Sequence, residues 1–338
     1  MNKPNLAILG ATGVVGREIT KIVDELQIPY NEIKFLSSAR SAGSEIEFQG
    51  RKYIVEECTP ESFEGVNIVM ASAGGAASKQ FAPEAAKRGA VFIDNSSAFR
   101  MQEDVPLVIA GVNDNDLKQH KGIIANPNCS TSQLMLVLKP LHDRAGIKRL
   151  IVSTYQSVSG AGIAAINELR QDTEANLQGK PFENKVFKKP ISFNVIPQID
   201  VFCENGYTKE EMKVDLETKK ILHLDPKTPI SCTAVRVPVY VGHSEAVDIE
   251  FGGKCSPDEA REILRKTFGV KVIDNPENFE YPTTRDAAGV DPVFAGRIRK
   301  CNAFENGISL WCVADNLRIG AALNTVRIAQ KIIEMELY

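Results

Sequence analysis

No apolar run in the 338-residue sequence comes near the roughly 20 residues that a membrane-spanning helix needs. The N-terminal region also lacks the longer apolar stretch and the small-residue cleavage site of a secretory signal. Charge of one sign is not in excess either, since the net charge is only -3. We therefore expect a cytoplasmic protein with neither nucleic acid nor a membrane as its partner.

Paired cysteines are also missing. The seven cysteines are an odd number, and no two of them form a Cys-x-x-Cys pair. This excludes a disulfide framework and a structural zinc site of the usual spacing, and we predict no metal site. At least one thiol stays free within a single chain. Because most free cysteines are small buried apolar residues, each has to be judged by its surroundings.

Hydrophobic residues (43%) and charged residues (25%) occur in the usual globular proportions, and the length favours two domains. In residues 1–128, short apolar runs at 6–9, 33–36, 67–71, 91–94, 107–110 and 123–125 alternate with helical patterns at 14–26 and 76–88. This alternation predicts a Rossmann-type, doubly wound parallel sheet of the α/β class. Residues 45–56 predict a hairpin with Gly50 at its turn.

The pattern changes after residue 128. Residues 149–157 and 233–251 alternate and are rich in β-branched residues, while 130–145, 163–177 and 257–268 have helical spacing. Residues 129–316 therefore predict a second, α+β domain with a mostly antiparallel sheet, and residues 180–190 a surface loop. The amphipathic segment 317–338 is expected to pack back on the first domain as a helix.

A glycine-rich turn follows the first predicted strand. Gly10, Gly13 and Gly16 form a Gly-x-x-Gly-x-x-Gly variant of the dinucleotide fingerprint, and a helix begins near Val14. Glycine lets the backbone approach a pyrophosphate, and the helix N-terminus offers unpaired N–H groups. An ordinary tight turn is the alternative, but the position after an N-terminal strand favours a cofactor site.

The end of the second predicted strand indicates which dinucleotide binds. Enzymes that use NAD usually carry an acidic residue there for the ribose 2′-hydroxyl. Here the strand runs into Ser-Ser-Ala-Arg-Ser, without a carboxylate but with Arg40 and Ser41. A 2′-phosphate suits these side chains, so the sequence predicts NADP, although a solvated turn would read the same way.

Cys129 lies in Asn-Pro-Asn-Cys-Ser-Thr, between a short predicted strand and a predicted helix. The positive end of a helix dipole favours the thiolate, which makes Cys129 the candidate nucleophile. Such a cysteine needs an acid–base partner. Of the four histidines, His243 ends an alternating segment and is the best candidate, but spacing alone leaves its role open.

Eight segments together resemble the aspartate-semialdehyde dehydrogenase family and run in the family's order. They are Gly-Ala-Thr-Gly-Val-Val-Gly (10–16), Asp-Asn-Ser-Ser-Ala-Phe-Arg (94–100), Asn-Pro-Asn-Cys-Ser-Thr (126–131), Thr-Tyr-Gln-Ser-Val-Ser-Gly (154–160), Glu-Glu-Met-Lys (210–213), Val-Arg-Val-Pro-Val (235–239), Gly-His-Ser-Glu (242–245) and Asp-Asn-Leu-Arg (315–318). The resemblance implies reversible, NADPH-linked reduction of L-aspartyl-4-phosphate to L-aspartate 4-semialdehyde with release of phosphate. That is a branch step toward lysine, methionine, threonine and isoleucine. It also implies a homodimer.

The resemblance further implies a role for each matching residue. Cys129 would form an acyl thioester, His243 would act as acid and base, and Gln156 would orient the acyl group. Arg236 would bind the substrate α-carboxylate and Glu210 its amine. The implied phosphate ligands are Arg100 and Lys213. The implied cofactor contacts are Gly10, Thr12, Gly13, Val14, Val15, Gly16, Arg40, Ser41, Ser159, Gly160 and Asn316.

Other interpretations stay open at this stage. Arg100 and Arg236 could be structural ion-pair partners, Glu210 and Lys213 a solvated face, and Gln156 a hydrogen-bonded strand residue. N-acetyl-γ-glutamyl-phosphate reductase shares the fold, cofactor and chemistry, but its cysteine typically follows glycine and precedes tyrosine. A catalytically silent NADP-binding homologue is a third possibility, because a fold does not prove an activity.

Overall fold

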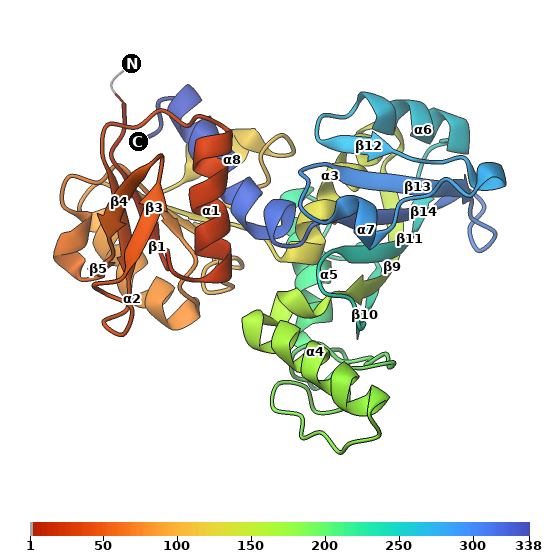
Figure 1. Ribbon diagram of the computed structural model, residues 1–338. Helices are drawn as coiled ribbons and strands as arrows, with labels where there is room; N and C mark the ends of the chain where they lie inside the picture. Colours follow the sequence, from red (N-terminus) through yellow and green to blue (C-terminus); the bar gives the residue numbers. More distant parts are fainter. Residues whose placement is uncertain (1–2) are drawn as a thin grey trace. The chain divides into compact units, whose positions relative to one another are not determined.

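The computed structural model describes residues 3–338, which form two compact units (Figure 1). The first unit contains the chain up to Asn128 together with Ala321–Tyr338, and the second is Cys129–Gly320. Within residues 3–338, no helix combines the length and the apolar character needed to cross a membrane.

The first unit is built on a six-stranded sheet in the order β5-β2-β1-β6-β7-β8, in which all neighbouring pairs are parallel. Its central strands are fully buried on both faces, which is why they read as continuous apolar runs. The strands are β1 Leu6–Leu9, β2 Ile33–Ser37, β5 Glu56–Glu57, β6 Ile68–Ala71, β7 Val91–Asp94 and β8 Ile123–Ala125. The predicted parallel sheet is confirmed.

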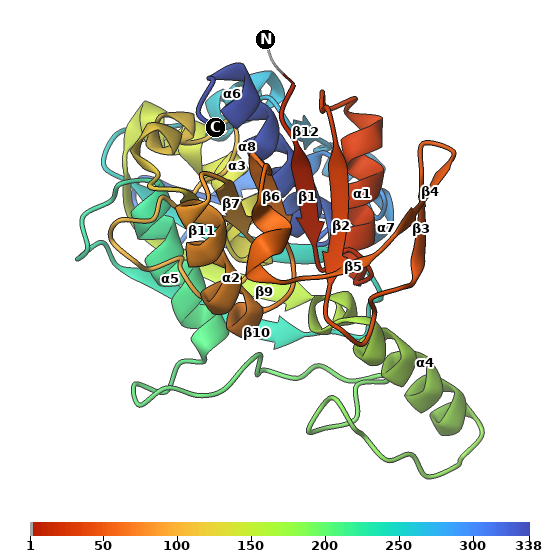
Figure 2. The same cartoon turned by 90° about the vertical axis from the view of Figure 1, so that its left-hand side faces the viewer.

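Helices cover both faces of this sheet. Helices α1 (Val14–Glu25) and α8 (Leu323–Glu334) pack together on one face, and α2 (Gly75–Lys87) lies on the other (Figures 1 and 2). Right-handed crossovers place them so, because the chain moves in opposite directions along the sheet after β1 and after β6. The predicted hairpin is also present as β3 (Glu45–Phe48) and β4 (Arg51–Ile54), with Gly50 in the turn at φ +72°.

The predicted strand at 107–110 is wrong. This segment forms a single parallel bridge, Leu107 to Ala125, and no ladder. Amide side chains take the backbone groups that a neighbouring strand would use. Asn113 bonds the carbonyl of Leu107 and the N–H of Ile109. Asn324 of α8 bonds the carbonyl of Val108 and the N–H of Ala110. An apolar run alone could not reveal these partners.

The second unit has a six-stranded mixed sheet in the order β10-β9-β11-β14-β13-β12. The pairs β9–β11, β11–β14 and β13–β14 are antiparallel, whereas β9–β10 and β12–β13 are parallel. The strands are β9 Ile147–Gln156, β10 Ile230–Arg236, β11 His243–Phe251, β12 Val270–Val272, β13 Val293–Lys300 and β14 Gly307–Ala314. The helices are α3 Cys129–Ala145, α4 Ile163–Leu177, α5 Lys209–Ile221, α6 Pro257–Lys266 and α7 Thr284–Ala287.

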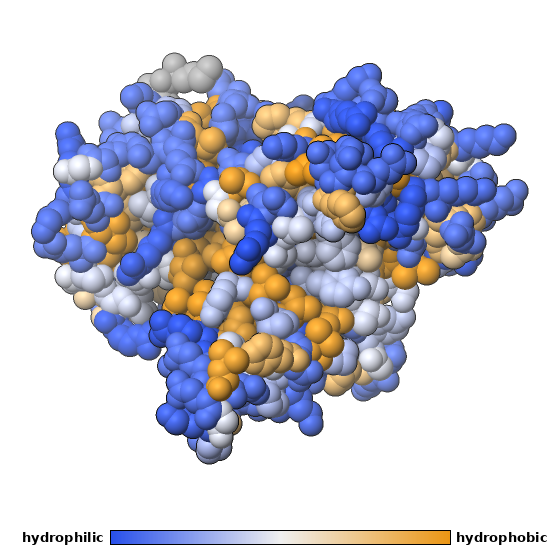
Figure 3. Space-filling model, turned by 45° about the vertical axis from the view of Figure 1, so that its right-hand side comes forward, coloured by the Kyte–Doolittle hydropathy of each residue, from blue (hydrophilic) through white to orange (hydrophobic). Residues whose placement is uncertain are grey.

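The two faces of this sheet differ. Helix α3 packs on β9, β11, β13 and β14, and α5 and α6 flank it. The alternating residues of β9 that face α3 are buried, and those on the other face are largely exposed. The other face holds an apolar hollow of about 540 Å³ between Tyr155, Trp311 and the segment before α7. In Figure 3, one side of the molecule shows apolar patches within a mostly hydrophilic surface.

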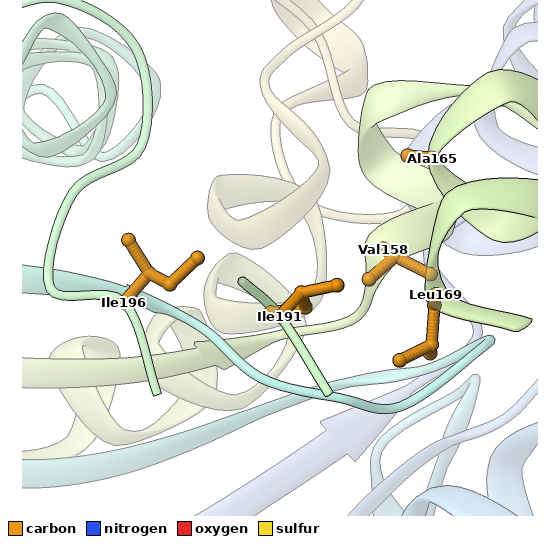
Figure 4. Packing of buried hydrophobic residues seen from close by; sticks show 5 residues of the cluster. All are labelled: Val158, Ala165, Leu169, Ile191 and Ile196. Atoms are coloured by element: carbon orange, nitrogen blue, oxygen red, sulfur yellow. The ribbon is translucent and has the colours of Figure 1, made fainter. Parts of the chain in front are cut away.

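A small apolar cluster anchors helix α4 and the chain that follows it. Val158, Ala165, Leu169, Ile191 and Ile196 pack together with little or no exposure (Figure 4). Two buried carboxylates hold the returning loop: Glu168 accepts the N–H groups of residues 185–187, and Asp172 accepts those of 191 and 192. The cluster therefore fixes the turn after β9.

Candidate active site

Three of the predicted site residues form one row across the buried face of the second sheet. Gln156 ends β9 and pairs with Arg236, which ends β10. His243 begins β11 one residue before Ser244, the partner of Tyr155, so His243 adjoins Gln156 at the same sheet edge. Their exposed fractions are 6% for Arg236, 1% for Gln156 and 0% for His243. The strand register thus brings Gln156 next to residues 80 and 87 positions further along the chain.

Cys129 is the first residue of α3 and is half-buried. Its thiol therefore lies at the positive end of a 17-residue helix, where the N–H groups of the first turn favour a thiolate. Gly320 packs directly against it, because a Cβ at Gly320 would lie 2.8 Å from Cβ of Cys129. Cys129 also lies close enough to Arg236 to affect its pKa. Burial lowers the pKa of Arg236, and the charge of Cys129 raises it.

A carboxylate from α5 completes one end of the row. The capping box of Thr208 and Glu211 sets the start of α5, and Glu210 follows within its first turn. Glu210 is 5% exposed and accepts a hydrogen bond from Nε2 of Gln156 at 3.1 Å. Arg236 and Glu210 therefore bring opposite charges next to Gln156.

Lys213 lies one turn further along α5. Its Nζ atom is 2.9 Å from Glu210 Oε2 and 3.1 Å from Asp200 Oδ2. Burial alone would lower the pKa of Lys213, but the two carboxylates outweigh it and raise the pKa. The structure thus places Lys213 in an ion-pair group with Glu210. Asp200 was not singled out from the sequence, where nothing marks it as a partner.

The amide of Gln156 has a defined orientation. Thr154 donates its hydroxyl hydrogen to Oε1 of Gln156 at 3.0 Å. Glu210 can only accept, so the amide nitrogen must face it and the amide oxygen must face Thr154. One N–H of the amide is thereby committed to Glu210, and the orientation of the other is fixed.

His243 is held by the turn after β9. The backbone N–H of Ser157 donates to Nδ1 of His243 at 3.1 Å, and the Ser157 hydroxyl lies 3.2 Å from the same atom. Since Nδ1 accepts, the neutral imidazole carries its proton on Nε2. Burial lowers the pKa of His243 to about 3, and the positive charge of Arg236 contributes to this shift. The ring is therefore a neutral Nε2–H donor.

Arg236 is fixed by the same turn. Its Nη1 atom donates to the carbonyl of Ser157 at 2.7 Å. Burial lowers the pKa of Arg236, while Cys129 and Glu210 act in the opposite direction. Ser157 thus contacts both Arg236 and His243. The serine is inside a motif noted in the sequence, but its role depends on the fold.

The row is bordered by Ser159, Gly160 and Asn316. The Asn316 side chain bonds the hydroxyls of Ser157 and Ser159 and the N–H of Gly242. A Cβ at Gly160 would lie 3.0 Å from Nη1 of Arg236 and 3.2 Å from Nε2 of His243. Only a glycine leaves both polar groups uncovered at this position.

The first unit contains the glycine-rich cradle. Gly10 has φ +83°, and a Cβ there would lie 2.3 Å from the carbonyl oxygen of Ser72. At Gly16 a Cβ would lie 2.1 Å from the carbonyl oxygen of Gly10. These close approaches require glycine and bring the turn to the start of α1 at Val14. The chain therefore has the backbone geometry that a pyrophosphate needs.

A cavity of about 530 Å³ adjoins this cradle. Gly10, Thr12, Gly13, Arg40 and Ser41 all line it. Val14, Val15 and Gly16 belong to α1 and shape the turn without lining the cavity. Lining residues not singled out from the sequence include Ser38, Glu57, Cys58, Ser72 and Gln80. The arginine and hydroxyls suit a phosphorylated ribose, whereas Glu57 adds a carboxylate to the same cavity.

Arg100 is held within the first unit. Its Nε atom donates to the carbonyl of Asn126 at 2.8 Å, and its Nη2 atom to that of Asn95 at 2.9 Å. Asn95 and Asn126 directly follow β7 and β8, so the guanidinium is fixed at the carboxyl ends of these parallel strands. Ligands of α/β sheets usually bind at such ends.

The chain matches two family models, described as the semialdehyde dehydrogenase NAD-binding domain (residues 5–120) and dimerisation domain (residues 138–319). It is 52% identical to the aspartate-semialdehyde dehydrogenase of Aquifex aeolicus over 97% of this chain and 98% of that protein. It is 47% identical to the one of Bacillus subtilis over 98% of each chain. The crystal structure of aspartate semialdehyde dehydrogenase II from Vibrio cholerae complexed with ASA has a TM-score of 0.95 at 44% identity, covering 99% of both chains. The chain belongs to the aspartate-semialdehyde dehydrogenase family.

Proposed function

We propose that the protein catalyses the reversible NADPH-dependent conversion of L-aspartyl-4-phosphate into L-aspartate 4-semialdehyde and phosphate, in the cytoplasm, as a step of amino-acid biosynthesis. The observation that carries the proposal is the row Arg236–Gln156–His243, with Glu210 beside it and Cys129 within electrostatic range of Arg236. A substrate that carries a carboxylate, an amine and an acyl group matches this set of charges and donors.

Substrate binding follows from the charges of the row. The Arg236 guanidinium, held at one nitrogen by the Ser157 carbonyl, would pair with the α-carboxylate. Glu210, which accepts a hydrogen bond from Gln156, would also accept from the α-amine. Arg100 is the proposed phosphate ligand from the first unit. Lys213 is shared by Glu210 and Asp200, so it would serve the phosphate only as part of that ion-pair group.

The first chemical step would use the thiolate of Cys129. Its sulfur attacks the acyl carbon, the bond from that carbon to the phosphate oxygen breaks, and phosphate leaves with the electron pair. An acyl thioester on Cys129 remains. The uncommitted N–H of the Gln156 amide and the Nε2–H of His243 would donate to the acyl oxygen, where negative charge develops.

Reduction completes the reaction. When bound, NADPH supplies a hydride. The Nε2–H of His243 would donate a hydrogen bond to the oxyanion that hydride addition leaves, and the ring would keep its proton as the carbon–sulfur bond breaks. The thiolate of Cys129 leaves with the electron pair, and the aldehyde is released.

Arg40 and Ser41 support NADP as the cofactor because they line the cavity beside the glycine cradle. Ser159, Gly160 and Asn316 remain proposed cofactor contacts.

We also propose that the protein acts as a homodimer. The match to a dimerisation domain over residues 138–319 supports this proposal. The exposed sheet face with Tyr155 and Trp311, whose ring centroids are 5.4 Å apart, offers an apolar contact surface. Sedimentation of the wild type and of Tyr155→Asp tests it: a monomeric wild type would refute the proposal.

The decisive experiment is phosphate-dependent reduction of NADP with L-aspartate 4-semialdehyde as substrate. NAD and N-acetyl-glutamate semialdehyde serve as parallel controls. Rapid turnover with the first aldehyde, lost without phosphate, is expected. Preference for the acetylated aldehyde would favour an N-acetyl-γ-glutamyl-phosphate reductase. No turnover with either, in protein that binds NADP, would favour a catalytically silent homologue.

Cys129→Ala and Cys203→Ala form a matched pair for the covalent step, since both thiols are half-buried. The first variant should bind NADP and lack turnover, and the second should keep both properties. Near-normal turnover of Cys129→Ala would refute the thioester mechanism.

A further inference from the structure

Glu245 is a buried acidic side chain for which the proposed mechanism has no use. It lies two residues after His243 on β11 and faces the same side of the sheet, with 0% of its surface exposed. Its cross-strand partners are Thr154 on β9 and Cys312 on β14. Glu245 therefore belongs to a second row, directly behind the row that contains Gln156 and His243.

Helix α3 brings Gln133 against this second row, one turn after Cys129. Nε2 of Gln133 donates to the carbonyl of His243 at 3.2 Å and approaches Sγ of Cys312 at 3.9 Å. Oε1 of Gln133 and both carboxyl oxygens of Glu245 are buried, and within the described residues none has a hydrogen-bond partner of normal geometry. Three buried acceptor oxygens without donors are unfavourable, and a proton on one of them would allow a hydrogen bond between two.

The surroundings of Glu245 favour the protonated form of its carboxyl group. Burial raises the pKa of Glu245 well above its usual range, and the neighbouring side chains of Gln133 and Ser130 offset this only in part. No described lysine, arginine or histidine forms an ion pair with it. A carboxylic acid that keeps its proton can donate a hydrogen bond, and Oε1 of Gln133 is an acceptor without a donor.

We propose that Glu245 is a positioning residue for the reaction: its carboxylic acid group bonds Gln133 and Ser130 of α3, and so fixes Cys129 in relation to His243. Ser130 follows the nucleophile directly, and Gln133 holds the backbone of His243. The second row also contains Thr154, which orients Gln156. This inference rests on the proposed function, because it assigns Glu245 to the same site.

A purely structural role makes a different prediction. A buried acid without an ionic partner does no better than an apolar residue of similar size as a filler of the core. If Glu245 only fills space, Glu245→Leu should leave the site intact. If the acid positions α3 against β11, then Glu245→Gln, which keeps an uncharged donor and acceptor, should rescue what Glu245→Leu loses.

The experiment compares wild type, Glu245→Gln and Glu245→Leu, with Val247→Ala as the control for lost packing at the next inward position of β11. We would measure kcat and KM, NADP binding, the melting temperature, and the rate at which iodoacetamide alkylates Cys129. Glu245→Leu should lose about tenfold to a hundredfold in kcat, with KM little changed, because small displacements of reacting groups have such effects. Glu245→Gln and Val247→Ala should stay within about threefold of the wild type.

Wild-type kcat and alkylation rate in Glu245→Leu would overturn the proposal, and so would a loss in Glu245→Gln as large as that in Glu245→Leu. Should Glu245→Leu fail to fold, Gln133→Met tests the same link from the helix side and should show the same loss of kcat. If the wild type itself does not turn over the semialdehyde, the proposed function fails. The alkylation rates of Cys129 then still decide the role of Glu245.

Discussion

The backbone N–H of Ser157 donates a hydrogen bond to Nδ1 of His243 at 3.1 Å. This bond fixes the neutral tautomer, because an atom that accepts cannot also carry the proton. Protonation of the ring would break the bond and place a charge in a fully buried position near Arg236. The histidine is therefore arranged to donate from Nε2, as in other enzymes in which a neutral imidazole polarises an oxygen.

This arrangement predicts a specific pH dependence of stability. The pKa of His243 falls from 6.5 to about 3 on folding, so between these values the unfolded chain binds the extra proton. The contribution of His243 to the free energy of unfolding is then fully present above pH 6.5 and is lost as the pH falls toward 3. From pH 7 to pH 5 the wild type should lose about 2 kcal/mol more than His243→Gln. Urea denaturation at both pH values measures the difference, and equal losses would contradict it.

Thr154→Val tests the orientation of the Gln156 amide. Valine fills the same volume but cannot donate to Oε1 of Gln156, so the amide loses its fixed direction. We expect kcat to fall by about tenfold, the equivalent of one hydrogen bond. Thr154→Ser keeps the hydroxyl and should retain most of the activity. If kcat falls in both variants, or in neither, the Thr154 hydroxyl is not what orients Gln156 for the reaction.

Gly320→Ala tests the close packing against the nucleophile. A methyl group there would lie 2.8 Å from Cβ of Cys129 and 3.0 Å from its Cα, so the first turn of α3 must move. We expect a loss of about 1–3 kcal/mol of stability from overpacking, and a fall in kcat of about tenfold or more. Gly75→Ala is the control, since a Cβ at that helical glycine meets nothing closer than 3.9 Å. Unchanged kcat in Gly320→Ala would show that Cys129 tolerates the shift.

The sequence predicted the parallel sheet because buried strands and amphipathic helices leave distinct periodicities. It could not predict the row Arg236–Gln156–His243, since neighbours across a sheet are set by strand register. The partner of Lys213, Asp200, lies in a turn at φ +67° that no pattern marks. The mistaken strand at 107–110 has the same origin, because the amides of Asn113 and Asn324 take its backbone groups.

Ser157 and Glu245 show a different limit of sequence reasoning. Both lie inside segments noted for other residues, one after Gln156 and one two places beyond His243. A serine in a turn and a glutamate in an alternating strand are unremarkable as residue types. Only the bond from Ser157 to His243 and the complete burial of Glu245 distinguish them.

Arg40→Asp tests the choice of cofactor. Arg40 and Ser41 line the cavity beside the glycine cradle, and β2 ends at Ser37 without a carboxylate. Aspartate at position 40 would repel a 2′-phosphate and could accept from a 2′-hydroxyl instead. The affinity for NADP should therefore fall by about tenfold to a hundredfold, the equivalent of one charge-assisted hydrogen bond, while that for NAD stays level or improves.

Glu57 gives this test a matched partner, because its carboxylate lines the same cavity as Arg40. Glu57→Gln removes a negative charge near the expected 2′-phosphate, so it should strengthen NADP binding and leave NAD binding nearly unchanged. Titration calorimetry of both variants with both cofactors measures the four affinities. Opposite shifts for NADP, with little change for NAD, would place the 2′-phosphate between these two side chains. Equal losses of NADP and NAD in Arg40→Asp would remove Arg40 from cofactor selection, because a shared part of the dinucleotide would then be what it contacts.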